Sequence, residues 1–260
     1  MNSKITLVVG TIIGILVFAI IIYSLVDYSK KSLVNEKNIL KLGKMNSSNY
    51  RIIPACEILR PKDGFTFTYN FQMKIENYFE EYGFWKHVFH RGTPIDTSKP
   101  LSYMLENDEI DNWDNLTSDY PYQSIGVWLH PTKNHLRIVL TTEDSNTYDY
   151  LDHANASTIY ENQNAPLTDL SYPKKIINTF DINDVPVNTP FNVGLIVNKN
   201  TITVYFNGIL RHIFSFRGTI VDNNASLYFH ALKTYNGYLN NFHYYPRAVS
   251  ESEIKKLSKK

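Results

Sequence analysis

The stretch FTFTYNFQMKIE, residues 65–76, alternates between apolar and polar side chains along its whole length. Its odd positions carry Phe, Phe, Tyr, Phe, Met and Ile, and its even positions carry Thr, Thr, Asn, Gln, Lys and Glu. Successive side chains of a β-strand point to opposite faces, whereas a helix repeats every 3.6 residues or so. The stretch therefore predicts a long strand with one face on a core and the other face in solvent or in a groove.

Shorter strand-like segments follow along the chain and are separated by turn signals. The residues PTKN join two of them, and Asn207-Gly208, a favoured pair for a type I′ hairpin turn, joins two others. Many short strands with almost no helical periodicity predict an all-β fold, an antiparallel β-sandwich. The expected further strands are 84–92, 124–130, 135–142, 191–198, 201–206, 209–216, 226–232 and 237–245.

The chain closes with NGYLNNFHYYPRAVSESEI, residues 236–254, where a strand meets a proline. Pro246 has no N–H group and cannot extend a central ladder, so it ends the strand. Ser250 and Glu253 have the Ser-x-x-Glu spacing of a capping box, which predicts a short terminal helix. We expect the last strand to pair back near the first one, so that this segment closes the domain without chemistry of its own.

An apolar segment lies near the N-terminus, where residues Ile5 to Leu25 contain no charge. As a helix it would span roughly 31 Å, about one hydrocarbon core. A cleaved signal peptide would have a shorter apolar region and a small-x-small cleavage site, so a retained anchor is favoured. We therefore expect a transmembrane helix in residues 1–25, a polar Lys-rich stalk over 26–50 and one domain over 51–260.

The charges beside this segment predict its orientation. One lysine precedes it and five follow it by residue 44, which places the large domain on the cytoplasmic side. In a virion membrane, the same topology would face the domain towards a capsid protein. Gly10 and Gly14 form a small-xxx-small pair, so a homodimer through the membrane helix is an alternative to a monomeric anchor.

Composition and motifs exclude several classes of function. The net charge of +1 gives no basic field for nucleic acid, and the single cysteine, Cys56, excludes an intrachain disulfide. The chain has no P-loop, no GxGxxG and no nucleophile signature, so no enzyme is expected. Its histidines form no metal motif, and strand alternation would place His87 and His90 on opposite faces.

Five segments follow one another along the chain: GFTFTYNFQMKI (64–75), FWKHVFHRG (84–92), IGVWLHPTKNHLRIVLTT (125–142), FDINDVPVNTPFNVGLIVNKNTITVYFNGIL (180–210) and NGYLNNFHYYPRAVSESEIKKL (236–257). Taken in this order, they resemble the laminin-G-like domains of the concanavalin A-like lectin/glucanase superfamily. The resemblance covers about residues 50–260 and implies a jelly-roll sandwich with a lectin-like role. This part of the chain is also similar to membrane-tethered domains in predicted proteins of large DNA viruses, and this similarity implies a place in a virion membrane.

Two departures from the family pattern affect what the resemblance implies. Phe191 stands where many relatives have Trp, which is a conservative core change. Asn240 and Asn241 stand where relatives often have acidic residues. An amide is a weaker calcium ligand than a carboxylate, so no cofactor is expected from this position.

An acidic stretch, EIDNWD, gives two further candidate sites. Glu109, Asp111 and Asp114 approximate the Glu-x-Asp-x-Glu of retaining glucanases, but the polar surroundings favour a solvated loop over catalysis. Asp108, Asp111 and Asp114 would supply oxygen ligands to calcium. Their spacing matches no EF-hand loop, so an ordinary acidic surface is the alternative.

Glycan binding by the loops of a sandwich needs exposed aromatic rings beside polar groups. The sequence therefore favours a membrane-anchored, non-catalytic recognition module that binds a glycan or a protein. A structural tether between a viral membrane and a capsid is the alternative, and a glucanase is the third. The candidate ligand-binding residues in turn-rich stretches are Trp113, Tyr120, Tyr122, Tyr148, Tyr150 and Tyr235.

Overall fold

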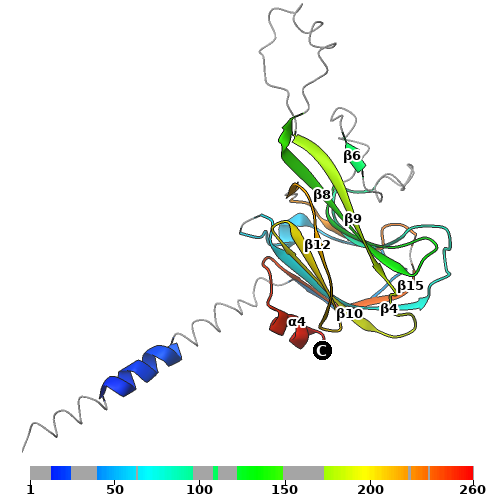
Figure 1. The fold of residues 1–260 in the computed structure, drawn as a ribbon. Helices are drawn as coiled ribbons and strands as arrows, with labels where there is room; N and C mark the ends of the chain where they lie inside the picture. Colours follow the sequence, from blue (N-terminus) through cyan, green and yellow to red (C-terminus); the bar gives the residue numbers. More distant parts are fainter. Residues whose placement is uncertain are drawn as a thin grey trace, which may run out of the picture. The chain divides into compact units, whose positions relative to one another are not determined.

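The computed structural model describes residues 13–24, 40–62, 64–95, 108–110, 122–148, 173–221, 224–233 and 235–259. The chain divides into two compact units, Met1–Ile39 and Leu40–Lys260. In the first unit, residues 13–24 form a helix, which is blue in Figure 1. Among the described residues, no helix has both the length and the apolar character needed to cross a membrane. The rest of the predicted anchor, together with Gly10, lies outside the described residues.

The second unit consists of two sheets in which every described strand pair is antiparallel (Figure 1). This arrangement confirms the predicted all-β, sandwich-like fold. Sheet A has the order β1 (Leu40–Leu42), β15 (Asn236–Tyr245), β4 (Phe67–Asn77), β10 (Phe191–Asn198), β11 (Thr201–Phe206) and β12 (Ile209–Ser215), with β2 (Met45–Asn46) on β15. Sheet B has the order β3 (Arg51–Ile53), β14 (Leu227–Phe229), β5 (Lys86–Gly92), β7 (Gln123–Leu129), β8 (His135–Tyr148), β9 (Pro173–Asn183) and β6 (Asp108–Ile110), with β13 (Thr219–Ile220) on β8.

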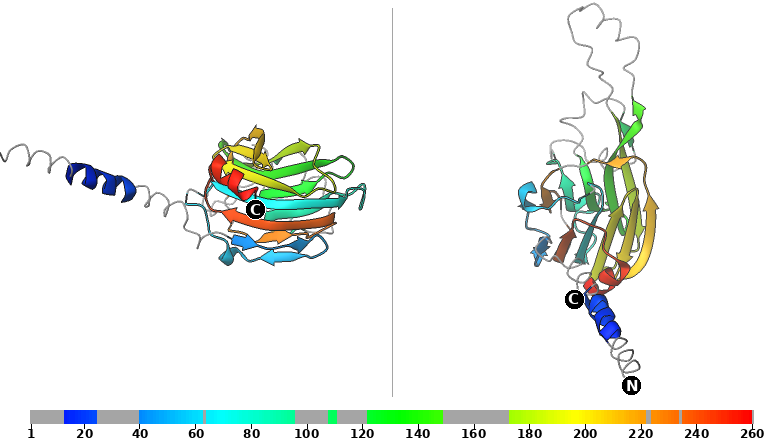
Figure 2. Two further views of the ribbon diagram at one scale, coloured as in Figure 1. Left: turned by 90° about the horizontal axis from the view of Figure 1, so that it is seen from below. Right: turned by 90° about the vertical axis from the view of Figure 1, so that its left-hand side faces the viewer.

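The two sheets pack face to face over one hydrophobic core (Figure 2). The odd positions of β4 point into this core, as the alternation predicts. Phe71 from sheet A meets Phe89 from sheet B with ring centroids 5.3 Å apart, and Phe242 of β15 lies 5.0 Å from Phe89. Burial of such rings is the main force that holds the sheets together.

The other face of β4 is less open than the alternation suggests. Thr68 and Asn70 occupy even positions but are buried. The Thr68 hydroxyl donates to the Arg247 carbonyl and accepts from the Val249 N–H, so the C-terminal segment covers this part of the strand. The expectation of solvent or a groove is therefore wrong for this half of β4.

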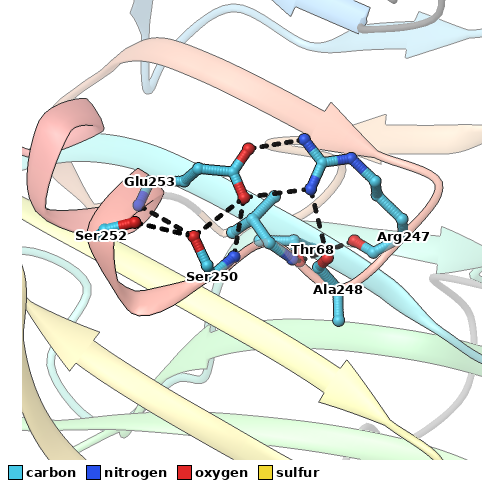
Figure 3. Close-up of polar contacts among 7 residues, drawn as sticks. Thr68, Arg247, Ala248, Ser250, Ser252 and Glu253 are labelled. Carbon is cyan, nitrogen blue, oxygen red and sulfur yellow. Dashed lines mark hydrogen bonds and ion pairs between the residues drawn. The ribbon is translucent and has the colours of Figure 1, made fainter. Parts of the chain in front are cut away.

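The C-terminal segment ends its strand and begins its helix where the sequence predicts, and Figure 3 shows the polar contacts at the start of the helix. Strand β15 ends at Tyr245, directly before Pro246, and pairs with β4. Helix α4 (Glu251–Leu257) then begins with a complete capping box, in which the Ser250 hydroxyl accepts from the Glu253 N–H and the Glu253 carboxylate accepts from the Ser250 N–H. Arg247 pairs with the same carboxylate at 2.6 Å, which fixes the start of the helix.

Several local features differ from the sequence-based expectations. Strands β1 and β2 pair with β15 although they lie in the segment expected to be a stalk. Residues Asp108–Ile110 form a strand on β9 rather than a loop. A short 3₁₀ helix, η2, spans Ala55–Glu57. The hairpin turn at Asn207-Gly208 has positive φ at both residues, as a type I′ turn requires.

Candidate functional site

The connection between β4 and β5, residues 78–85, reads YFEEYGFW and is here called the aromatic loop. It turns tightly, because the Phe79 N–H donates to the Asn77 side chain, the Tyr82 N–H to the Phe79 carbonyl and the Phe84 N–H to the Glu81 carbonyl. Glu81 and Gly83 both have positive φ. These turns leave no room for the inside–outside alternation of a strand, so rings that a strand would bury can face solvent.

Three rings of the aromatic loop are exposed. Phe79 is 72% exposed, Tyr82 is 56% exposed and Phe84 is 55% exposed. Phe79 and Tyr82 lie beside each other, with ring centroids 6.3 Å apart. Single exposed apolar residues are common on protein surfaces, but three large rings within six residues are a typical mark of a contact surface.

The base of the aromatic loop is fixed to the body of the sandwich. Tyr78 is buried and its hydroxyl donates to the His130 carbonyl at 2.7 Å. Burial raises the pKa of Tyr78 to about 12, so the phenol remains a donor throughout the neutral range. The Gly83 N–H donates to the Pro131 carbonyl at 3.1 Å, which ties the tip of the loop to the β7–β8 turn.

Charged groups stand at two sides of the rings. Lys233, in the connection between β14 and β15, lies 5.3 Å from the Phe84 ring and pairs with Glu81 at 3.0 Å. On the other side, the guanidinium of Arg137 lies 4.6 Å from the ring of Trp85 and makes a bidentate pair with Asp181. The loop therefore combines apolar ring faces with carboxylate and ammonium groups that can hydrogen-bond a ligand.

Arg137 keeps the carboxylate of Asp181 charged. Burial raises the pKa of the Asp181 carboxyl, but the hydrogen bonds and charge of Arg137 outweigh this effect and lower it overall. Under the loop, burial lowers the pKa of Lys86, whose ammonium donates to the Phe84 and Pro131 carbonyls. Lys86 thereby supports the backbone of the loop from below.

Three of the six residues that sequence reasoning proposed for ligand binding lie in the described part of the chain, namely Tyr122, Tyr148 and Tyr235. Tyr122 is half-buried beneath the Lys175 ammonium, which lies 3.2 Å from its ring centroid. Tyr235 is buried beside His230 and offers no exposed ring. The backbone of Tyr148 ends β8 opposite Pro173. Trp113, Tyr120 and Tyr150 lie outside the described residues.

The proposed acidic sites are described only in part. Asp108 and Glu109 lie in β6, where they pair with Ile177 and Ile176 of β9. Asp111 and Asp114 lie outside the described residues. Within the part of the chain that the structure describes, no three His, Cys, Asp or Glu side chains gather to hold a metal ion.

Sequence reasoning missed the aromatic loop. It assigned Phe84 and Trp85 to a strand, whereas β5 begins at Lys86. The available signal was the composition of residues 78–85, in which five of eight residues are aromatic and two glutamates and a glycine interrupt them. A polar, glycine-containing break between two apolar strands is typical of a turn, and the rings in it have no core position to occupy.

Comparison with known proteins does not assign the chain to a family. No protein-family model and no curated protein sequence matches it. Among solved structures, the binding domain of Paraclostridial Mosquitocidal Protein 1 has a TM-score of 0.48 and 14% identity, with 85% of this chain and 45% of that chain covered. The botulinum neurotoxin serotype D binding domain has a TM-score of 0.48 and 12% identity, with 85% and 42% covered.

A third similar structure is the binding domain of botulinum neurotoxin DC in complex with rat synaptotagmin II, with a TM-score of 0.47 and 12% identity. It is covered over 46% of its length, and this chain over 85%. The chain thus spans less than half of the chains that it matches. TM-scores below 0.5 at such low identity do not indicate a function for this chain.

Proposed function

We propose that this chain is a non-catalytic recognition module with a laminin-G-like sandwich, and that it binds a glycan at the aromatic loop. The observation that carries the proposal is the group of three exposed rings on a loop whose base is fixed by Tyr78 and whose tip is fixed by Gly83. A sugar ring has an apolar face that stacks on an aromatic ring and hydroxyl groups that need polar partners. Glu81 and Lys233 stand beside the rings and supply such partners.

The geometry favours a glycan over a membrane surface or a protein. Glu80 and Glu81 stand in the middle of the loop, and carboxylates resist transfer into an apolar or anionic bilayer surface. A standard protein interface takes about 20–30 residues from each partner. The rings of Phe79, Tyr82 and Phe84 lie within six residues, which is a site for one or two sugar rings.

We further propose that the module is held at a membrane by residues Ile5 to Leu25. The support is the uncharged, apolar run of 21 positions. Such an anchor would place many copies of the sandwich on one surface. Weak binding of each copy to a glycan would then add up through multivalency.

The test is a glycan array probed with the full-length chain in mild detergent. We expect a restricted set of saccharides to bind, and Tyr82→Ala or Phe84→Ala to weaken binding by about tenfold, the loss that corresponds to about 1.4 kcal/mol. Ile213→Ala is the matched control, because Ile213 is also a large exposed apolar residue but lies on β12.

Two outcomes would contradict the proposal. The first is an array without signal under conditions where the protein is folded. The second is a glycan that binds the Tyr82 and Phe84 variants as well as it binds the parent chain. Capture of a protein that depends on the same two rings would instead assign the loop to protein recognition.

A further inference from the structure

Two buried histidines, His87 and His90, lie side by side on the face of sheet B opposite the core. Strict alternation would separate them, but β5 has a bulge: His87 pairs with Trp128 and Phe89 with Val127, so Val88 is an extra residue. The bulge returns His90 to the same face as His87. Their ring centroids are 4.9 Å apart, and both side chains are fully buried. The expectation that these histidines point to opposite faces is therefore wrong.

The hydrogen bonds of this pair form a chain with one direction. At one end, the Ala231 N–H donates to His87 Nδ1 at 2.8 Å. A backbone N–H can only donate, so His87 carries its proton on Nε2 and donates it to His90 Nδ1, 2.8 Å away. His90 therefore also carries its proton on Nε2, which donates to the Thr93 carbonyl at 3.0 Å. The two backbone groups at the ends fix both tautomers.

This chain has no place for an additional proton. On His87 the proton would sit on Nδ1 and face the Ala231 N–H. On His90 it would sit on Nδ1 and face the Nε2–H of His87. Either way two donors meet, and a hydrogen bond of 2.8 Å becomes a repulsive contact.

The surroundings also oppose a positive charge. His90 stacks on Tyr228 of β14 at 4.8 Å, and His87 packs against Trp128 of β7 at 4.6 Å. Burial lowers the pKa of His87 well below its usual value, and the neighbouring His90 and His230 lower it further. Burial lowers the pKa of His90 to about 4, although the hydrogen bond to Thr93 opposes this.

Other titratable side chains lie on the elements that pack around the pair, and each has contacts of its own. From the β14 side these are Tyr228 and His230, whose Nδ1–H donates to the Asn49 carbonyl. Tyr50 follows Asn49, and its pKa is raised by burial and, to a smaller extent, by its interaction with Tyr228. Lys233 approaches with its backbone carbonyl, while its ammonium turns to Glu81.

The pair holds the segment that contacts the aromatic loop. His87 binds this segment, residues 230–233, at two points: its Nδ1 accepts from the Ala231 N–H, and its backbone N–H donates to the Lys233 carbonyl at 2.8 Å. Lys233 in turn pairs with Glu81 at 3.0 Å and lies 5.3 Å from the Phe84 ring. A change in the protonation of His87 is thus transmitted to the aromatic loop through Lys233.

We propose that the His87–His90 pair is an acid-released latch, which holds segment 230–233 against the aromatic loop when neutral and frees it when it takes up a proton. The proposal rests on the proposed function in so far as the aromatic loop is the binding site that it regulates. The latch keeps Lys233 and Glu81 in place at neutral pH. Acid opens the latch and removes the ordered polar side of the site.

Hydrogen exchange of the full-length chain tests the latch without any ligand. In the released segment the histidine has its ordinary pKa near 6.5, so opening with uptake of one proton rises roughly 30-fold between about pH 7.5 and pH 5. We expect the protection of the Ala231 amide, corrected for intrinsic exchange, to fall by about this factor. Amides of residues 79–85 should lose protection in the same pH range.

A variant separates the latch from a general loss of structure. His87→Asn places an amide oxygen near the position of Nδ1, where it accepts from Ala231 at every pH, so we expect the part of the pH dependence at Ala231 that comes from His87 to disappear. Any dependence that remains belongs to His230, which lies in the same segment and whose pKa burial lowers to about 4. His212→Asn is the matched control, because His212 lies on β12 and stacks on Phe214 instead. It should keep the pH dependence of the parent chain.

Ring ¹⁵N shifts of the parent chain keep the test decisive if His87→Asn does not fold. They should show both histidines protonated on Nε2 near neutral pH, and a proton on Nδ1 of either ring would overturn the latch. So would unchanged protection of Ala231 in acid, or loss of protection at residues 230–233 without any change in the aromatic loop. None of these results depends on a glycan, so the latch and the proposed function fail separately.

Discussion

Gly237 shows how a single residue can be required by close backbone approach. It lies in β15 at a register shift in the pairing with β4, with φ at +155°. A Cβ atom at this position would lie 1.9 Å from the Lys74 carbonyl oxygen. Its N–H donates to the Ser47 hydroxyl, and its carbonyl accepts from the Ser47 N–H, so it also holds the end of β2.

We therefore expect Gly237→Ala to destabilise the domain. Backbone strain costs roughly 1–3 kcal/mol and overpacking costs a similar amount, so the free energy of unfolding should fall by about 2–4 kcal/mol. Chemical denaturation of the full-length chain measures this change. Gly43→Ala is the control, because a Cβ there has no described atom within 4 Å, and equal losses at both glycines would contradict the argument.

Strand β4 and the C-terminal segment that carries helix α4 lie far apart in the sequence but meet in the folded protein. Thr68 of β4 bridges the Arg247 carbonyl and the Val249 N–H, and Ile254 of α4 is buried next to Gly194 of β10. Gly194 leaves a depression that Ile254 fills, since a Cβ there would lie 3.0 Å from the Ile254 side chain. The helix is thus part of sheet A's outer covering and not a free tail.

Removal of the helix cap should loosen this covering. We expect Ser250→Ala to lower the free energy of unfolding by about 1 kcal/mol, because the N–H of Glu253 loses its side-chain acceptor and keeps only the Ser250 carbonyl. Thermal unfolding checks the prediction. Ser215→Ala, an exposed serine at the end of β12, should change the melting temperature little, and a similar shift in both variants would show that the cap does not stabilise the helix.

The elements that sequence predicted are those whose signals are local. The alternation in β4, the turn at Asn207-Gly208 and the capping box at Ser250 each depend on a few neighbouring residues. The bulge at Val88 depends on the pairing of β5 with β7, which no local pattern encodes. Strand β9 was also missed, because Ile176 and Ile177 are adjacent and interrupt the period of two.

The candidate site was missed for a related reason. Sequence reasoning looked for rings in stretches without alternation, and it treated Phe84 and Trp85 as the start of a strand. Whether a ring is exposed depends on where the neighbouring strand ends, and that point is fixed by Tyr78 and by the turns at Glu81 and Gly83. Tyr235 shows the opposite case, because this tyrosine in a turn-rich stretch is buried in the hydrophobic core.

At the scale of the whole molecule, the sandwich buries three neutral histidines near one another. Burial lowers the pKa of both His90 and His230 to about 4, and it also lowers the pKa of His87. The folded protein with the latch closed therefore stays neutral at these positions in mild acid, whereas the unfolded chain takes up protons below about pH 6.5. Acid consequently favours the unfolded chain.

The free energy of unfolding should therefore be independent of these groups above about pH 6.5 and should fall as the pH drops towards 4. Each histidine adds a slope of up to about 1.4 kcal/mol per pH unit in that range. Urea titrations at a series of pH values measure the slope. His90→Asn should reduce this slope by the contribution of one histidine, up to about 1.4 kcal/mol per pH unit. His212→Asn is the control and should leave the slope unchanged. An acid slope that is the same in all three proteins would exclude His90 as a source of the slope.

The pairing of β1 and β2 with β15 has a mechanical consequence. The polypeptide enters the sandwich at Leu40 and is joined at once to the last strand through a ladder of backbone bonds. Tension from anything attached upstream is therefore carried into β15, which runs the length of sheet A beside β4. A pull on the residues before Leu40 therefore loads the ladder between β1 and β15 first.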